Sequence, residues 1–330
     1  MKSLGLLGFD CFKSLYLALT LFIAPFCATS VLAQFPQKPI RVIVPQAAGS
    51  ASDATARMLV HELSVSLNQS IFIDNKPGGG FTIGLDLIAK APPDGYTLGV
   101  GPVGAMVISP NMMSKIPYDI ERDFQPIALI TRGHLLLAVS PQLPVNSVAE
   151  LIAYAKKFPH KLSNASSSNG SPGHVGGELF KLMTGTQITH IPYKGGAQAF
   201  ADFAAGRIQA MVGPLDLDDK MQGKSHPLAV LQAKRSSLRP DTPTLAEIGF
   251  PKVNILAWTG FFAPAKTPQP ILEQLSSEMV KVFKRPDLQD IFLKLGSNLE
   301  GSTPAALGAI LKSQFPVWKE AIQFAKIPVE

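Results

Sequence analysis

Cysteine is scarce in this chain. Only Cys11 and Cys27 occur among 330 residues, and both lie within the first 33. From residue 34 onwards the chain therefore has neither a disulfide nor thiolate chemistry. Charged residues make up only 16% of the sequence. The basic ones are scattered and form no stripe, so the sequence gives no support to a nucleic-acid partner.

Long apolar runs are also missing, with one exception at residues 14–26, which carry no charge. This run is shorter than the roughly 20 residues that a membrane-spanning helix needs. Lys2 and Lys13 precede this run, and small residues follow it, with Val31 and Ala33 at the −3 and −1 positions. This order predicts a cleaved secretory signal peptide over 1–33, and hence a periplasmic protein. The alternatives are a buried helix, a membrane anchor or a lipid anchor on Cys27.

About 297 residues remain after that segment, a length typical of two domains rather than one core. The formal net charge falls from +6 to +5, because the segment holds two lysines and one aspartate. A mild positive charge favours anionic solutes, although it acts on steering and does not define a site.

Short apolar runs alternate with helical patterns along the chain. The run 40–44 predicts a strand, followed by a helix over 52–67 with Ser52 or Asp53 as its N-cap. A second set of such units begins near residue 134, and 270–324 is expected to be mostly helical, with breaks at the prolines. The repeated order predicts an α/β fold with parallel sheets covered by helices on both faces.

Three loops share one design, in which a strand leads through small residues into a helix. They lie at 45–53, 166–174 and 192–196. Ligands bind at the carboxyl ends of parallel strands, and a helix N-terminus offers unpaired N–H groups and a partial positive charge. Each loop alone could be an ordinary tight turn. Together they predict a site for an anion such as a carboxylate.

Other chemistries find less support. The stretch 99–104 matches G-x-G-x-x-G, but Pro102 lies inside it and Pro110 follows closely, which disfavours a dinucleotide site. The six histidines show no metal-ligand spacing, and no motif places Ser, His and Asp in a catalytic triad. A periplasmic hydrolase using His174 and a nearby serine is kept as an alternative. We expect no cofactor, no metal and no enzymatic activity.

At these loops the sequence resembles a known family, the substrate-binding receptors of tripartite tricarboxylate transporters, also called Bug receptors. The resemblance runs in order along the chain from residue 35. It rests on F-P-Q-K-P-I-R-V-I-V-P (35–45), N-K-P-G-G-G (75–80), P-D-G-Y-T-L (93–98), S-S-N-G-S-P-G-H (167–174), H-I-P-Y-K-G-G (190–196), D-T-P-T-L-A-E-I-G (241–249) and W-T-G-F-F-A-P (258–264). Each stretch is weak by itself, but the ordered set is specific.

The resemblance implies a Venus-flytrap fold of the type II periplasmic-binding-protein kind, with two α/β lobes joined by two crossing strands. We place the crossings near 131–134 and 254–258. Lobe 1 is then 34–133 plus 257–330, and lobe 2 is 134–256. It also implies capture of a small carboxylate between the lobes and its delivery to the membrane subunits of a transporter. We expect the receptor itself to be a monomer.

Carried over by position, the ligand-binding residues fall on loops of both lobes. In lobe 1 they are Gln46, Ala47, Ala48, Gly49, Ser50, Ser52 and Asp53. In lobe 2 they are Ser167, Ser168, Asn169, Gly170 and Ser171, bordered by Tyr193, Lys194 and Gly213.

Two places depart from the family pattern. The first loop usually reads F-P-A-G-G-G-T-D, whereas here it has fewer glycines and Gln46 replaces an aromatic residue. After 208–212 the family often has Phe-Asp-Asn, whereas here Gly213 and Pro214 follow Val212. Without that acidic group, we expect a ligand that lacks an ammonium group, such as a dicarboxylate or an aromatic carboxylate. A ligand sensor for a signalling kinase would show the same fold and site.

Overall fold

The structure is a computed structural model that describes residues 35–220 and 222–328. The predicted signal peptide, 1–33, lies outside the described residues. The chain divides into two units, one ending at Gln37 and the other beginning at Lys38, and only the second is described below.

Six strands form the first sheet, in the order β11-β4-β10-β3-β1-β2. Their bounds are β1 Ile40–Val44, β2 Ile71–Asn75, β3 Thr97–Pro102, β4 Phe124–Gly133, β10 Ala257–Pro264 and β11 Ser297–Leu299. β1 pairs in parallel with β2 and β3, while β10 is antiparallel to both β3 and β4, and β11 is antiparallel to β4.

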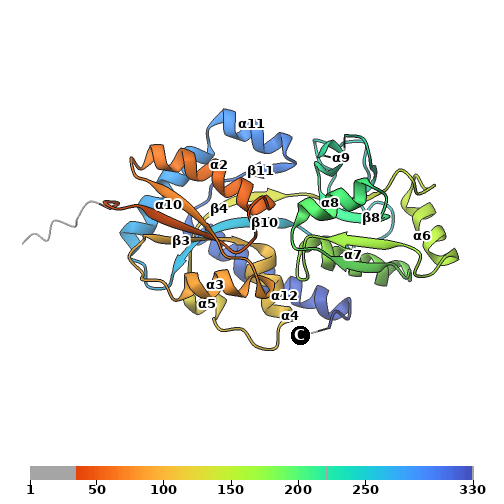
Figure 1. The fold of residues 1–330 in the computed structure, drawn as a ribbon, viewed down its shortest axis with the longest axis horizontal. Helices are drawn as coiled ribbons and strands as arrows, with labels where there is room; N and C mark the ends of the chain where they lie inside the picture. The colour runs from red at the N-terminus through yellow and green to blue at the C-terminus, as the bar shows by residue number, and fades with distance from the viewer. Residues whose placement is uncertain (1–34, 221, 329–330) are drawn as a thin grey trace, which may run out of the picture. The chain divides into compact units, whose positions relative to one another are not determined.

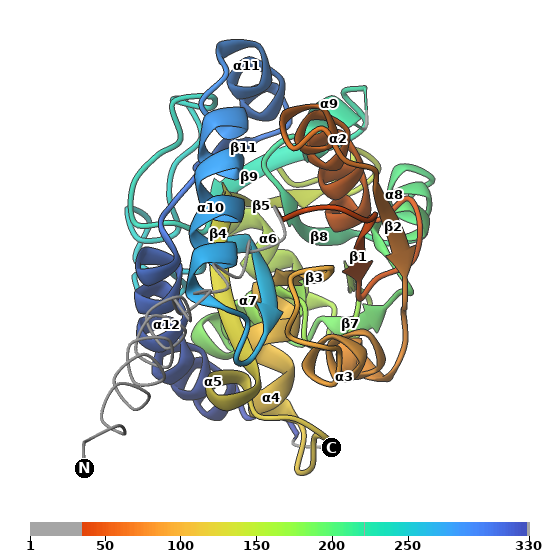
Figure 2. The ribbon, with the colours of Figure 1, turned by 90° about the vertical axis from the view of Figure 1, so that its left-hand side faces the viewer.

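Helices cover both faces of this sheet (Figures 1 and 2). α2 (Ala51–Ser66) and α10 (Gln269–Phe283) lie side by side on one face, and α3 (Thr82–Ala89) and α12 (Pro304–Phe324) lie on the other. Further helical segments complete this part: η1 (Gly79–Phe81), η2 (Gly104–Ile108), α4 (Ser109–Met112), α5 (Ile120–Asp123) and α11 (Pro286–Lys294). β1, α2, β2, α3 and β3 form two successive crossover units, which explains why α2 and α3 take opposite faces.

Five strands form the second sheet, in the order β7-β6-β8-β5-β9. Their bounds are β5 Leu135–Val139, β6 Ser163–Ser166, β7 Thr189–Pro192, β8 Ala210–Pro214 and β9 His226–Val230. The helices here are α6 (Val148–Lys157), α7 (Pro172–Thr184), α8 (Gly196–Ala204) and α9 (Leu217–Lys220). β6 is parallel to β7 and β8, and β5 is antiparallel to β8 and β9. α7 and α8 lie on opposite faces of this sheet (Figure 1).

The predicted α/β architecture with two lobes is confirmed, but the prediction of parallel sheets was wrong in part, because both sheets are mixed. Each sheet has a parallel βαβ core, and antiparallel strands join it where the chain passes from one sheet to the other. β4 belongs to the first sheet and β5 to the second, separated by His134 alone. The return passage lies between β9 and β10. The lobe boundaries at 134 and 256 stay a prediction.

Two local predictions are corrected by the structure. Ser50, and not Ser52 or Asp53, is the N-cap of α2, because its hydroxyl accepts a hydrogen bond from the Asp53 N–H. Pro316 does not break the C-terminal helix, which runs through it from Pro304 to Phe324. The prolines at 286 and 304 do begin helices, at the position where the missing N–H costs nothing.

One large apolar core passes from the first sheet to the second. It contains Phe262 and Ile322 together with Val175 and Leu179. The C-terminal part of α12 packs on α7 (Figure 1), and the Lys252 ammonium lies 4.7 Å from the centre of the Phe324 ring. Burial of this kind provides about 25 cal/mol per Å² of apolar surface. The apolar contact between α12 and α7 therefore helps to hold the two lobes together. Among the described residues, no helix is both long and apolar enough to cross a bilayer.

Candidate functional site

The first predicted loop connects β1 to α2 at the carboxyl edge of the first sheet. Gln46 and Ala47 are half-buried, Ala48 and Gly49 are exposed, and Ser50 is buried at the helix N-terminus. Gly49 has a left-handed backbone (φ +79°) that an L-residue rarely adopts. α2 runs for 16 residues, so its N-terminus is a full helix end with outward-pointing N–H groups.

The Asp53 side chain is buried and forms hydrogen bonds within the protein. The residue is 2% exposed, and its carboxylate accepts hydrogen bonds from the Gly49 N–H (2.8 Å), Asn75 Nδ2 (2.9 Å) and Arg57 Nε (2.9 Å). Burial raises the pKa of this carboxyl, but these hydrogen bonds outweigh it and hold the pKa below its ordinary value. Asp53 therefore fixes the loop, and its oxygens are already taken by internal donors.

The second predicted loop leads from β6 into α7. The Ser171 hydroxyl caps α7 by accepting from the His174 N–H, and it donates to the Ser168 carbonyl (2.8 Å). The Ser166 hydroxyl donates to the same carbonyl (2.9 Å). Gly170, with φ +69°, allows the turn. These bonds hold the loop over an α7 N-terminus, with Ser167 and Ser168 half-buried and Asn169 exposed.

The third loop and the end of β8 lie next to the second loop. The N–H groups of Tyr193 and Gly195 donate to the carbonyls of Ser166 and Ser167 (3.0 and 2.9 Å). A Cβ placed on Gly173 would stand 2.4 Å from the Val212 carbonyl oxygen, so α7 begins directly against the end of β8. The structure thus brings the lobe 2 candidates together, with Gly213 next to that contact.

Tyr193 and Lys194 differ in their availability. The Tyr193 hydroxyl donates to Asp202 Oδ2 (2.7 Å). Partial burial and the neighbouring Asp202 raise the pKa of Tyr193 to about 12, so the phenol stays neutral. The Lys194 side chain is exposed. Tyr193 therefore supports the loop, while Lys194 is free to provide long-range attraction for an anion.

A turn after β3 lies against the second predicted loop. η2 is a single π-helical turn that follows β3, and every residue in it is buried. π turns inside helices are frequent at functional sites. A Cβ on Gly104 would lie 2.9 Å from the Gly170 carbonyl oxygen, and a Cβ on Gly170 would lie 2.8 Å from Ser109 Oγ. The glycines of the G-x-G-x-x-G stretch therefore serve close packing, and the last one lies against the second loop. In the sequence, the glycine-rich stretch 99–104 at the end of a predicted strand is the feature that indicates this close packing.

Two polar atoms of the candidate set lack a partner. Gln46 Oε1 and Ser168 Oγ are both buried without any hydrogen bond. A buried polar group without a partner costs about 1–3 kcal/mol. One atom belongs to the first loop and the other to the second, so a ligand that bonds to both would remove this cost from both sides.

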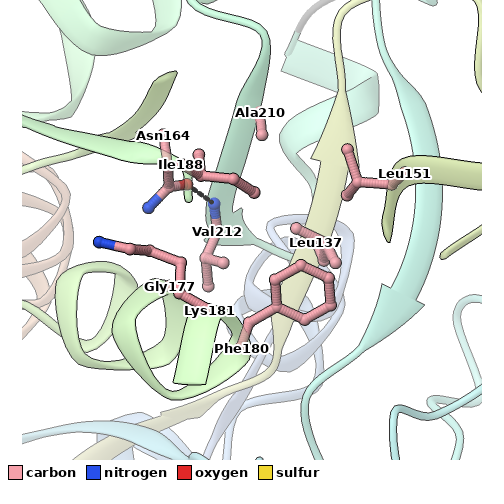
Figure 3. Close-up of a pocket in the computed structure, with 9 residues that line it drawn as sticks. All are labelled: Leu137, Leu151, Asn164, Gly177, Phe180, Lys181, Ile188, Ala210 and Val212. Carbon is pink, nitrogen blue, oxygen red and sulfur yellow. Dashed lines mark hydrogen bonds between the residues drawn. The ribbon is translucent and has the colours of Figure 1, made fainter. Parts of the chain in front are cut away.

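The small internal cavity of lobe 2 cannot hold a solute. It lies between α7 and the second sheet (Figure 3), with a volume of about 10 Å³, and is lined by side chains such as Leu137, Phe180 and Val212. A space of this size admits one water molecule at most. The Asn164 amide at its edge accepts from the Val212 N–H (3.2 Å), so the polar group there is already paired within the sheet.

The structure also shows where serine and histidine meet. Ser166 Oγ lies 2.7 Å from His190 Nε2, but Ser166 is 1% exposed. His174 Nδ1 accepts from the Gly170 N–H (3.3 Å), and its ring stacks on that of His190 with centroids 4.0 Å apart. Burial, the neighbouring His174 and Lys181 lower the pKa of His190 to about 3. These contacts support the second loop from its buried side. Ser166 is therefore not accessible to a substrate.

Two lobes, each with a mixed sheet and a small-residue loop at the start of a long helix, define the class of two-lobed solute-binding proteins. The chain belongs to the tripartite tricarboxylate transporter receptor family, whose model matches residues 55–323. BugT of Bordetella pertussis is 31% identical over 292 residues, which cover 88% of this chain and 90% of that protein.

Solved structures agree with this assignment. The R. palustris protein Rpa4515, solved with adipate, is 33% identical with a TM-score of 0.85, covering 89% of this chain and 99% of that one. MatC from Rhodopseudomonas palustris, solved with bound malate, is 28% identical with a TM-score of 0.81, covering 87% of this chain and all of that one. The predicted family and fold are thereby confirmed. The individual ligand-binding residues stay a prediction.

Proposed function

We propose that this chain is an exported periplasmic receptor that captures a small carboxylate between its two lobes and delivers it to a tripartite tricarboxylate-type transporter. The observation that carries the proposal is the pair of unpartnered buried atoms, Gln46 Oε1 and Ser168 Oγ, in the loops that lead into α2 and α7. Relatives with the same fold hold adipate and malate. The predicted signal peptide over 1–33 provides the export.

The proposed grip uses neutral groups. Helix N-termini stabilise an anion by about 0.3–1 kcal/mol each when exposed, and by about 2 kcal/mol when partly buried. Gln46 Oε1 can only accept a hydrogen bond, so it fits a ligand hydroxyl, a protonated carboxyl or an amide N–H. Ser168 can donate to a carboxylate oxygen. The set therefore suits a carboxylate whose second functional group is polar.

The ligand is expected to lack an ammonium group. The oxygens of Asp53 are already used by Gly49, Asn75 and Arg57. At the end of β8, Gly213 and Pro214 offer no acidic side chain. A desolvated ammonium without a carboxylate partner would be strongly unfavourable, so dicarboxylates and aromatic carboxylates are the favoured classes.

Capture works by closure of the lobes, without covalent chemistry. The ligand contacts both lobes, so it binds the closed form better than the open one and shifts the population by that difference in affinity. Closing removes water and strengthens the contact between N–H groups and carboxylate. The closed, loaded receptor then docks as a monomer on the membrane subunits.

A thermal-shift screen of the purified protein tests this proposal. The panel contains malate, adipate and benzoate, with aspartate and glutamate as amino acids of similar size. A ligand present at about 100 times its Kd should raise the free energy of unfolding by about 2.7 kcal/mol. Stabilisation by amino acids alone would contradict the expected ligand class. Consumption of a stabilising ligand during incubation would favour an enzyme instead.

A further inference from the structure

Three metal-ligating side chains lie together behind the second loop. His174 and Glu178 are on α7, and His190 is on β7. One ligand atom of each side chain lies within 4.8 Å of those of the other two. Within residues 35–220 and 222–328, no other group of three or more His, Cys, Asp or Glu side chains lies this close together.

The ligand types and their placement fit a transition-metal ion. Two imidazoles and one carboxylate are a known ligand set for Zn²⁺, with a fourth position left for water. His174 and Glu178 are four residues apart on α7 and so lie on the same face of the helix. β7 is the edge strand of the second sheet and lies next to α7, which brings His190 to that face.

The cluster is enclosed on one side and open on the other. His174 is 7% exposed, whereas the side chains of Glu178 and Lys181 are 18% and 24% exposed. An ion can therefore enter past Glu178 and Lys181 at the sheet edge. The base of the cluster is fixed, because Ser166 Oγ lies 2.7 Å from His190 Nε2. Metal-bound imidazoles usually have an orienting neighbour of this kind.

The ammonium group of Lys181 already pairs with the Glu178 carboxylate of this cluster. Lys181 Nζ lies 2.8 Å from both carboxylate oxygens of Glu178. A partly exposed pair of this kind stabilises the fold by less than about 1 kcal/mol, and the lysine stem is long enough to move its ammonium into water. A divalent ion can therefore replace the Lys181 ammonium at Glu178.

The rings must rearrange when the ion binds. The imidazoles are now stacked with an interplanar angle of 14°, whereas metal bonds lie in the plane of each ring. Zn–N bonds of about 2.0–2.1 Å at a tetrahedral centre bring the ligand atoms to about 3.4 Å from one another. The ligand atoms now lie within 4.8 Å of one another, so the His174 ring rotates out of the stack while Ser166 keeps His190 oriented. We propose that His174, Glu178 and His190 form a binding site for a divalent transition-metal ion of the Zn²⁺ type.

Calorimetric titration of the tag-free protein with ZnCl₂ alone tests this site. We expect one equivalent to bind, and His190→Asn and Glu178→Gln each to weaken binding at least tenfold. His160→Asn, which changes an exposed histidine outside the cluster, should leave the affinity unchanged. Co²⁺ in place of Zn²⁺ should give the strong visible absorption of a four-coordinate site, lost in His190→Asn.

Lys181→Ala provides a test that leaves all three metal-binding side chains in place. Because the ammonium competes with the ion for Glu178, its loss should tighten Zn²⁺ binding, whereas a merely structural lysine would leave the affinity unchanged or weaken it. Unchanged Zn²⁺ binding in His190→Asn and Glu178→Gln, or binding that does not tighten in Lys181→Ala, overturns the proposal. If either ligand variant fails to fold, Lys181→Ala decides alone.

Discussion

The carbonyl oxygen of Gly170 lies 2.9 Å from the place where a Cβ atom on Gly104 would stand. Gly104 follows β3 of the first sheet, and Gly170 belongs to the loop between β6 and α7 of the second. The two lobes therefore approach each other backbone to backbone beside the candidate site. If the lobes close on a solute as proposed, a side chain at this point would limit the closure.

Gly104→Ala should weaken solute binding. The new methyl group must displace a backbone carbonyl, at a cost of about 1–3 kcal/mol, which corresponds to roughly a 5- to 150-fold loss of affinity. Isothermal titration with the best ligand of the carboxylate panel measures it. Gly308→Ala is the matched control, because its Cβ would only make an ordinary 3.6 Å contact with Pro126. Equal affinity in both variants would show that Gly104 does not limit closure.

Ser168→Phe should abolish solute binding without unfolding the protein. Ser168 is half-buried, and its hydroxyl is an unpartnered atom of the candidate site. A phenyl ring would occupy the space of the solute, and we expect a loss of at least about a hundredfold, or 2.7 kcal/mol. Ser313→Phe, on an exposed position of α12, controls for the added ring. Unchanged affinity in Ser168→Phe would remove the second loop from the site.

Asp53→Asn should destabilise the protein at neutral pH. The carboxylate accepts three hydrogen bonds, and losing its charge and one acceptor should cost about 1–3 kcal/mol. Since the folded pKa lies below the ordinary value of 3.8, the contribution is present above that value and is lost as the pH falls below it. Urea unfolding at pH 7 and pH 3 should show the difference between wild type and variant shrinking in acid.

Asp290→Asn on α11, where the side chain is exposed, is the control for the Asp53 experiment. Removing an exposed charge of this kind should change the free energy of unfolding by less than about 0.5 kcal/mol. A difference between wild type and Asp53→Asn that stays constant from pH 7 to pH 3 would contradict the role of the ionised carboxylate.

Trp258 should report lobe closure by fluorescence. It lies on β10, close to the second passage between the sheets, and its Nε1 is buried without a partner. Trp318, in α12, donates instead to Gln314 Oε1 (3.2 Å). A ligand-dependent change in emission should therefore persist in Trp318→Phe and disappear in Trp258→Phe. The opposite result would place the movement along α12.

Local sequence patterns already specified much of this protein. The run 40–44 is β1 itself, and the helix expected at 52–67 is α2 at Ala51–Ser66. The small-residue loops fall where the pattern places them, before α2, α7 and α8. Such features depend on neighbours within a few residues, through strand periodicity, capping and left-handed glycines. The two-lobed fold was predicted from the family motifs.

Only the tertiary structure decided what distant residues do to one another. The Asn75 amide at the end of β2 donates to a carboxylate oxygen of Asp53 on α2, while a contact of Asp53 with a ligand stays a prediction. Gly104, the last glycine of the G-x-G-x-x-G stretch, packs against Gly170 across the lobes. His174 and His190 meet only because β7 and α7 pack together. Strand pairing and side-chain packing join residues far apart in the chain, and no local pattern encodes that proximity.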